Sequence, residues 1–222
     1  MAKVKSSSGK KHRSNPEWLR RHVTDPYVKQ AAAQGYRSRA AFKLAEIDDR
    51  LKLLRPGAVV VDLGSAPGSW TQVVRERLTD RGGAVRGRII ALDLLPMDPL
   101  PDVTFIQGDF RDEAVEAQLA EALAGAPVDL VLSDMAPNLS GIAAADAARS
   151  SHLAEIAIEF ARRHLRPSGA VLLKAFQGSG FSQLVELLKR EFVTVGVRKP
   201  AASRAESAET YLFARGLKQQ PR

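Results

Sequence analysis

The sequence of 222 residues contains no cysteine. This absence excludes disulfide frameworks, thiol nucleophiles, zinc fingers and cysteine-ligated iron–sulfur clusters. Long apolar runs are also missing, because the longest aliphatic stretches, at 58–61 and 170–173, fall far short of the roughly 20 residues that span a bilayer. Residues 1–16 lack the apolar stretch of a secretory signal. We therefore expect a cytoplasmic protein without a membrane partner.

Acidic residues are scarce at the N-terminus. Residues 1–43 hold eleven Lys and Arg against two acidic residues, whereas the rest of the sequence is nearly balanced, and the whole chain carries a formal charge of +8. Such an asymmetry predicts a polyanionic partner, with nucleic acid as the first candidate. The basic, Ser-rich residues 1–14 are expected to form a flexible arm. A solvated tail without a partner and an organellar transit peptide are the other interpretations of this arm.

Beyond the arm we expect a single domain over 15–217 and a short tail at 218–222. Its first part, 15–55, is predicted to be helical and to face RNA through its basic side chains. Three helix starts are marked by residues that favour the N-cap, two of them followed by proline: Asn15, Asp25 and Ser38. Gly35 is expected to end the second of these helices and the RPG stretch at 55–57 the third.

The second part, 56–217, alternates short β-branched runs with segments of helical periodicity, which is typical of an α/β fold. Strands are predicted at 58–62, 88–93, 103–109, 128–134, 170–176, 192–199 and 210–215, and helices near 69–80, 111–124, 146–165 and 181–190. The last two strands have no helix between them and can pair antiparallel. We therefore expect a seven-stranded, mostly parallel, doubly wound sheet with an antiparallel edge strand.

Chemistry-bearing residues follow the predicted strands. Gly64 and Gly68 lie in a loop after the first strand, and acidic residues or a lysine mark the ends of the next four: Asp93, Asp109, Asp134 and Lys174. Ligands of open α/β sheets bind beyond the carboxyl ends of the strands, so these side chains are candidate ligand contacts. Each alone also fits a turn-capping or strand-end role. The loop does not match the GxGxxG dinucleotide fingerprint.

Seven segments of the chain resemble the FtsJ/RrmJ ribosomal RNA 2′-O-methyltransferases: SRAAFKL (38–44), VVDLGSAPGSW (60–70), ALDLLPMDP (91–99), GDFRDE (108–113), SDMAPNLSG (133–141), KAFQGSGF (174–181) and VRKPAASRAESAETY (197–211). The resemblance implies a Rossmann-like fold that uses S-adenosylmethionine. It further implies methylation of a uridine ribose in the peptidyl-transferase A-loop of large-subunit rRNA, in the 50S particle or a late precursor, by an enzyme expected to be a monomer.

The same resemblance implies roles for individual residues. Its cofactor positions fall on Gly68, Trp70, Asp93, Asp109 and Asp134, and its catalytic set falls on Lys43, Asp134, Lys174 and Glu209. Two departures from the family pattern are Ser69, where a second glycine is usual, and a longer stretch at 80–87. The four histidines show no metal-ligand spacing, so no metal site is expected.

The residue types suit methyl transfer to a hydroxyl, which requires alignment of the two reactants and removal of one proton. Lys174, with a second cation at Lys43, could act as a neutral general base. The carboxylate of Asp134 instead favours a charged lysine that orients the 2′-oxygen. Trp18 and Tyr36 could stack on RNA bases or simply pack in the protein.

Other functions remain open from the sequence. Methylation of tRNA or of an mRNA cap would use related enzymes, and a ribosome-assembly protein could have the fold without the activity. A cap enzyme should carry extra segments for a cap pocket. A protein without activity should have lost at least one member of the catalytic set.

Overall fold

A computed structural model of the chain describes residues 24–137 and 140–218. The predicted arm, the helix expected from Asn15 and the end of the predicted tail lie outside the described residues. No helix within the described ranges is long and apolar enough to cross a bilayer.

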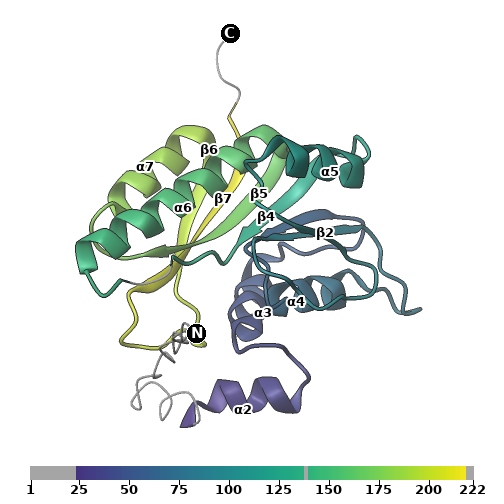
Figure 1. Cartoon of the computed structure of the whole chain (residues 1–222), viewed down its shortest axis with the longest axis horizontal. Helices are drawn as coiled ribbons and strands as arrows, with labels where there is room; N and C mark the ends of the chain where they lie inside the picture. The colour runs from purple at the N-terminus through teal and green to yellow at the C-terminus, as the bar shows by residue number, and fades with distance from the viewer. Residues whose placement is uncertain (1–23, 138–139, 219–222) are drawn as a thin grey trace, which may run out of the picture.

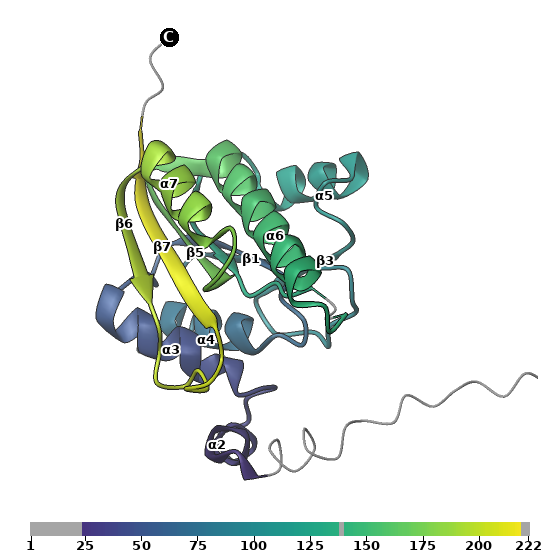
Figure 2. The same ribbon diagram turned by 90° about the vertical axis from the view of Figure 1, so that its left-hand side faces the viewer.

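Seven strands form one sheet in the order β3-β2-β1-β4-β5-β7-β6. The strands are β1 (Val59–Leu63), β2 (Arg88–Asp93), β3 (Thr104–Gln107), β4 (Val128–Ser133), β5 (Leu165–Phe176), β6 (Phe192–Arg198) and β7 (Glu209–Leu217). Strands β1 to β5 pair in parallel, and β7 pairs antiparallel with both β5 and β6. Figure 2 shows β7 between its two partners, with β6 at the outer edge. The predicted seven-stranded, mostly parallel sheet with antiparallel pairing at one edge is confirmed.

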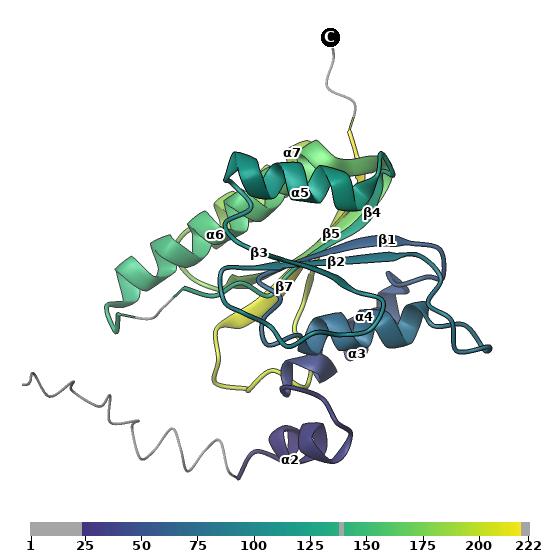
Figure 3. The same ribbon diagram turned by 45° about the vertical axis from the view of Figure 1, so that its right-hand side comes forward.

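Helices cover both faces of the sheet. On one face lie α3 (Ala40–Leu51) and α4 (Ser69–Leu78), and on the other α5 (Glu113–Leu123), α6 (Ala143–His164) and α7 (Phe181–Glu191) (Figure 3). Two clusters of buried apolar residues, one on each face, hold these layers together. Because both faces are covered, the central strands read as continuous apolar runs rather than alternating ones.

The helix α2 (Pro26–Ala33) lies beyond α3, away from the sheet (Figure 1). Its N-cap Asp25 accepts a hydrogen bond from the N–H of Tyr27 at 3.0 Å, as the Asp-Pro signal predicts. The Asp25 carboxylate also forms ion pairs with Arg39 and with Arg204 in the loop between β6 and β7. This contact fastens the helical segment to a loop that lies far away in the sequence.

Several predicted boundaries differ from the observed ones, and two of the differences have a clear physical reason. Strand β5 begins at Leu165 rather than Ala170, and its register with β4 is irregular between Val128 and Leu130. Pro167 in this stretch has no N–H to donate to a neighbouring strand, so the sequence at 165–169 predicts a loop. Helix α3 ends at Leu51, before the RPG stretch, and Lys52 adopts a left-handed conformation.

Asp48 explains the early end of α3. Its buried carboxylate accepts the N–H groups of both Leu53 and Leu54 at 2.8 Å. One side chain thus accepts hydrogen bonds from two N–H groups of the segment that follows the helix. The helix therefore ends before Pro56, which would otherwise end it.

We predict that Asp48→Ala lowers the free energy of unfolding by about 2–4 kcal/mol, because two buried N–H groups lose their acceptor. Urea denaturation measures the change. The neighbouring Asp49→Ala is the control: Asp49 pairs with Arg77 at 2.8 Å in a more exposed setting, and its loss should cost less than about 1 kcal/mol. Equal losses in the two variants would contradict the capping role of Asp48.

Candidate active site

The loop between β1 and α4 passes the point where the winding of the sheet reverses, between β1 and β4. Gly64 and Gly68 adopt positive φ angles of 71° and 104° there. A Cβ atom on Gly64 would lie 2.4 Å from Cγ of Met135, which follows β4. Glycine is therefore required for this loop to approach the end of β4 so closely.

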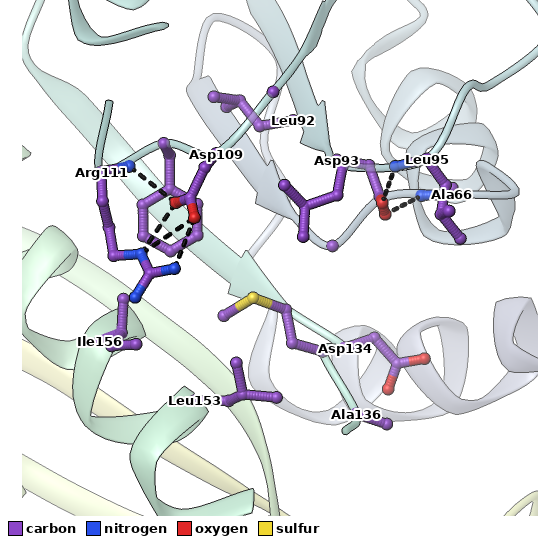
Figure 4. Close-up of a pocket in the computed structure, with 15 residues that line it drawn as sticks. Ala66, Leu92, Asp93, Leu95, Asp109, Arg111, Asp134, Ala136, Leu153 and Ile156 are labelled. Carbon is purple, nitrogen blue, oxygen red and sulfur yellow. Dashed lines mark hydrogen bonds and ion pairs between the residues drawn. The ribbon is translucent and has the colours of Figure 1, made fainter. Parts of the chain in front are cut away.

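A cavity of about 470 Å³ opens at the carboxyl ends of β1 to β4. Three of the predicted cofactor residues line it: Asp93, Asp109 and Asp134 (Figure 4). Apolar side chains form much of the remaining wall, among them Leu95 and Ile156. The topology thus gathers three carboxylates from three different strands around one partly apolar space.

Asp93 ends β2 and holds the glycine loop. Its two carboxylate oxygens each accept one backbone N–H, from Ala66 and from Leu95, both at 2.8 Å (Figure 4). An ionised carboxylate offers about four lone-pair positions. Asp93 therefore shapes the loop and can still accept hydrogen bonds from a ligand.

Asp109, after β3, contacts Arg111. The guanidinium Nε lies 2.9 Å and 3.1 Å from the two carboxylate oxygens, and Nη2 lies 2.5 Å from one of them. Hydrogen bonds from the Arg111 side chain, with a smaller contribution from its backbone N–H, lower the pKa of Asp109 below its ordinary value, although partial burial opposes the shift.

Asp134 connects the cavity to a second group of polar side chains. The ammonium of Lys174 lies 3.0 Å from its carboxylate and donates to its backbone carbonyl at 2.8 Å. The hydroxyl of Tyr211 donates to the same carboxylate at 2.9 Å. Lys174 and Tyr211 are directly opposite in the pairing of β5 with β7, which explains why both reach Asp134.

Lys43 and Glu209 form the other ion pair of this group, with Nζ 2.7 Å from a carboxylate oxygen. Glu209 also accepts a hydrogen bond from the hydroxyl of Ser203 at 2.8 Å. Burial alone would raise the pKa of Glu209, but the charges of Lys43 and Lys174, together with these hydrogen bonds, hold it below its ordinary value. Glu209 is therefore a carboxylate at neutral pH.

The structure thus gathers the four predicted catalytic residues into two adjacent ion pairs. Tyr211 was missed as a site residue. Burial, followed by the charges of Asp134 and Glu209, raises its pKa well above the ordinary value, so its hydroxyl stays protonated as a donor. The alternation of the last strand could have indicated that this side chain lies on the same face as Glu209, two residues earlier.

The other two predicted cofactor residues do not line the cavity with side chains. The ring of Trp70 is buried, packs against Tyr211 at a centroid distance of 5.6 Å and donates its N–H to the carbonyl of Ala40. Gly68 precedes α4 and faces Arg37 and Met97. Their assignment to the cofactor stays a prediction. It would require a contact through their backbone atoms or an indirect effect on the shape of the loop.

Tyr36 packs rather than presenting a free ring. It lies edge-on to Phe42, and its hydroxyl donates to Glu76 at 2.6 Å. Burial and this hydrogen bond raise the pKa of Tyr36 to about 12. Trp18 lies outside the described residues. Within residues 24–137 and 140–218, no group of three or more His, Asp and Glu is arranged to hold a metal ion.

Comparisons with known proteins indicate the family of the chain. The model of the FtsJ-like methyltransferase family matches residues 36–217. The ribosomal RNA large subunit methyltransferase E of Bordetella parapertussis is 62% identical over 208 residues, covering 94% of this chain and 99% of that protein. The protein with the same name from Burkholderia mallei is 58% identical, covering 94% and 98%.

A solved structure shows the same fold. The crystal structure of a protein described as a ribosomal RNA methyltransferase from Plasmodium falciparum superposes with a TM-score of 0.73 at 33% identity. The match covers 82% of this chain and 98% of that one.

Asp62 is a further carboxyl group close to the loop, in strand β1 two residues before Gly64. It is fully buried, and one oxygen accepts the hydroxyl of Thr71 at 2.7 Å while the other has no partner among the described residues. Burial is the main cause that raises the pKa of Asp62 to about 7; the charges of Asp134 and Asp93 add to it, and the Thr71 contact opposes it.

We predict that Asp62 makes stability fall as the pH rises from about 4 to about 7. The folded state holds a proton that the unfolded state releases near its ordinary pKa of 3.8, so the stabilisation is complete below that pH and lost as pH passes the folded value. The slope is at most about 1.4 kcal/mol per pH unit.

Denaturation curves at several pH values measure this slope. Asp62→Asn keeps an acceptor for Thr71 but does not titrate. The free energy of unfolding of this variant should therefore fall less between about pH 4 and about pH 7 than that of the wild type. Asp112→Asn, at an exposed N-cap without a side-chain cap bond, should keep the wild-type slope. A variant at Asp62 with an unchanged slope would show that this carboxyl group does not titrate in the window.

Proposed function

Since this chain belongs to the FtsJ-like methyltransferase family, we propose that it transfers the methyl group of S-adenosylmethionine to a ribose 2′-hydroxyl of large-subunit rRNA. The target is a uridine in the A-loop of the peptidyl transferase centre, and the reaction contributes to late ribosome assembly. The names of the relatives support the large-subunit rRNA; the motif resemblance supports the 2′-position and the uridine. We further propose that the protein acts as a monomer in the cytoplasm.

The dual position of Asp134 is the observation that carries this proposal. It lines the cavity and also binds Lys174. A methyl donor in the cavity would therefore be adjacent to the lysine that manages the acceptor hydroxyl. A cavity without a neighbouring polar group, or a polar group without a cavity, would fit a binding protein as well as an enzyme.

The cavity residues fit S-adenosylmethionine. Its volume of about 470 Å³ lies within the range of small-molecule sites. Three carboxylates suit a ligand that carries a sulfonium and an ammonium group. Asp93 retains lone pairs for a ribose diol, Asp109 faces the cavity where a nucleobase amino group could donate, and the apolar wall suits the flat base. When bound, the cofactor supplies an electrophilic methyl group.

The chain contributes orientation and proton control. Lys174 donates to the carboxylate and to the carbonyl of Asp134, which fixes its ammonium beside a residue that lines the cavity. A further N–H of this ammonium can hold the 2′-oxygen in line with the methyl group, and the proton leaves late to solvent. The alternative, a neutral lysine as general base, remains testable by the pH dependence of the rate.

Lys43 and Glu209 support this arrangement. Their ion pair is mostly buried, with side chains 12% and 13% exposed. The lysine adds positive charge beside the reacting oxygen, and Glu209 keeps that lysine in place. The basic N-terminal segment would hold the phosphates of the RNA, which supply affinity but little sequence information.

We predict that Asp93→Ala weakens S-adenosylmethionine binding by about 1.5–3 kcal/mol, the contribution of a hydrogen bond to a charged group. Isothermal calorimetry measures the dissociation constant. Asp98→Ala, in the segment that follows β2 but outside the cavity wall, should bind as wild type. Wild-type affinity in Asp93→Ala would show that this carboxylate does not bind the ribose.

We predict that Lys174→Ala abolishes methyl transfer while the affinities for cofactor and RNA stay near wild type, because its contact belongs to the transition state. Arg should not substitute, since its planar guanidinium does not fit an ammonium-sized site. The assay maps 2′-O-methyl groups on rRNA incubated with protein and cofactor, and an RNA with a 2′-deoxyuridine at the target gives the background.

Lys189→Ala is the matched control, because this exposed lysine pairs with Glu186 on the same helix. It should methylate at the wild-type rate. If Lys174→Ala retained more than about a tenth of the single-turnover rate, a loss below about 1.4 kcal/mol, the catalytic assignment of Lys174 would be refuted.

A further inference from the structure

The carboxylate of Asp109 is occupied by another residue of the chain. Arg111 supplies three side-chain contacts at 2.5–3.1 Å, and its backbone N–H donates to one carboxylate oxygen at 3.0 Å. These four contacts match the roughly four lone-pair positions of a carboxylate. Figure 4 shows the guanidinium lying across both oxygens.

Asp93, on the opposite side of the same cavity, is different. It receives one backbone N–H on each oxygen, and both of its donors lie in loops that frame the cavity. A ligand can therefore add hydrogen bonds to Asp93 without displacing a donor. A ligand that donates to Asp109 must first displace part of the Arg111 side chain.

Arg111 is placed so that it can move. Its side chain is 59% exposed, and it lies two residues before the first residue of α5. It lines the main cavity and also a neighbouring cavity of about 380 Å³ between α5 and α6, whose wall includes Glu116 and Glu155. A guanidinium that leaves Asp109 therefore finds carboxylates nearby.

We propose that Arg111 competes with the 6-amino group of adenine for the carboxylate of Asp109 and so limits both the affinity of the site and its preference for adenine. This inference rests on the proposed function, which places an adenosyl cofactor in the cavity. The expected effect is small, because an exposed ion pair contributes only about 0.2–1 kcal/mol, which corresponds to a change of about 1.4- to fivefold in the dissociation constant.

Two other roles of Arg111 make different predictions. A guanidinium that stacks on the base or donates to its ring nitrogens would strengthen binding, so its removal would weaken it. A guanidinium that acts only through its charge would affect ligands of equal charge alike, whatever base they carry. Competition for Asp109 alone predicts a gain that depends on the 6-amino group.

The experiment compares S-adenosylhomocysteine with S-inosylhomocysteine by isothermal calorimetry. The two ligands have the same charge, but the second carries an oxygen at position 6 that cannot donate to Asp109. In Arg111→Ala we expect the dissociation constant of S-adenosylhomocysteine to fall about 1.4- to fivefold, as the ion-pair contribution implies. The dissociation constant of S-inosylhomocysteine should not fall.

Arg86→Ala is the matched control. Arg86 pairs with Asp80 at 2.6 Å with side-chain exposures of 63% and 27%, close to the 59% and 23% of Arg111 and Asp109, but lies in the turn between α4 and β2. Neither ligand should bind differently to this variant.

The outcomes separate the two proposals. If wild type binds S-adenosylhomocysteine and Arg111→Ala binds it equally or more weakly, the competition is refuted and the proposed function stands. An equal gain for both ligands would also refute it, in favour of a pure charge effect. If wild type does not bind S-adenosylhomocysteine at all, the proposed function fails, and the competition fails with it.

Discussion

The contact between Asp134 and Lys174 is the interaction on which the proposed site depends. It joins the residue after β4 to the carboxyl-terminal part of the adjacent strand β5, and it places a lysine ammonium beside Asp134, which lines the cavity. Both side chains are mostly buried, with exposures of 18% and 8%. Removing either partner would leave a poorly solvated charge, so each needs the other.

The rest of the site is built around this pair. Tyr211 reaches Asp134 because β7 runs antiparallel beside β5, and Glu209, two residues before it, brings Lys43 from α3 into the same group. The antiparallel strand therefore completes the site as well as the sheet. A fully parallel sheet would need a crossover between β6 and β7 and would not present these two side chains from a short connection.

Five carboxyl groups near the loop and the cavity illustrate how environment separates chemically equal side chains. Asp62 is desolvated and holds its proton up to about pH 7, whereas Arg111 keeps Asp109 ionised. Asp93 accepts hydrogen bonds from two backbone N–H groups and thereby shapes the loop. Asp134 and Glu209 hold lysines. Each role follows from the donors that the fold places beside the carboxyl group.

The sequence by itself determined the α/β architecture, the order of the strands along the chain and the positions of the acidic residues at their ends. These features are local: strand β2 coincides with its predicted range because an apolar β-branched run and its flanking turns depend only on neighbouring residues. The motifs also indicated the four residues of the two ion pairs, although only through a family resemblance. The tertiary structure alone decided which side chains meet.

Three examples give the physical reason. Trp70 turns its ring into the apolar cluster because a partner from α3 accepts its N–H, which no local pattern encodes. Helix α3 ends early because Asp48 captures two N–H groups after the helix, before the proline acts. Arg111 occupies Asp109 because the turn after β3 folds the guanidinium back onto the carboxylate. Contacts between side chains depend on distances and directions in space, and a linear pattern specifies neither.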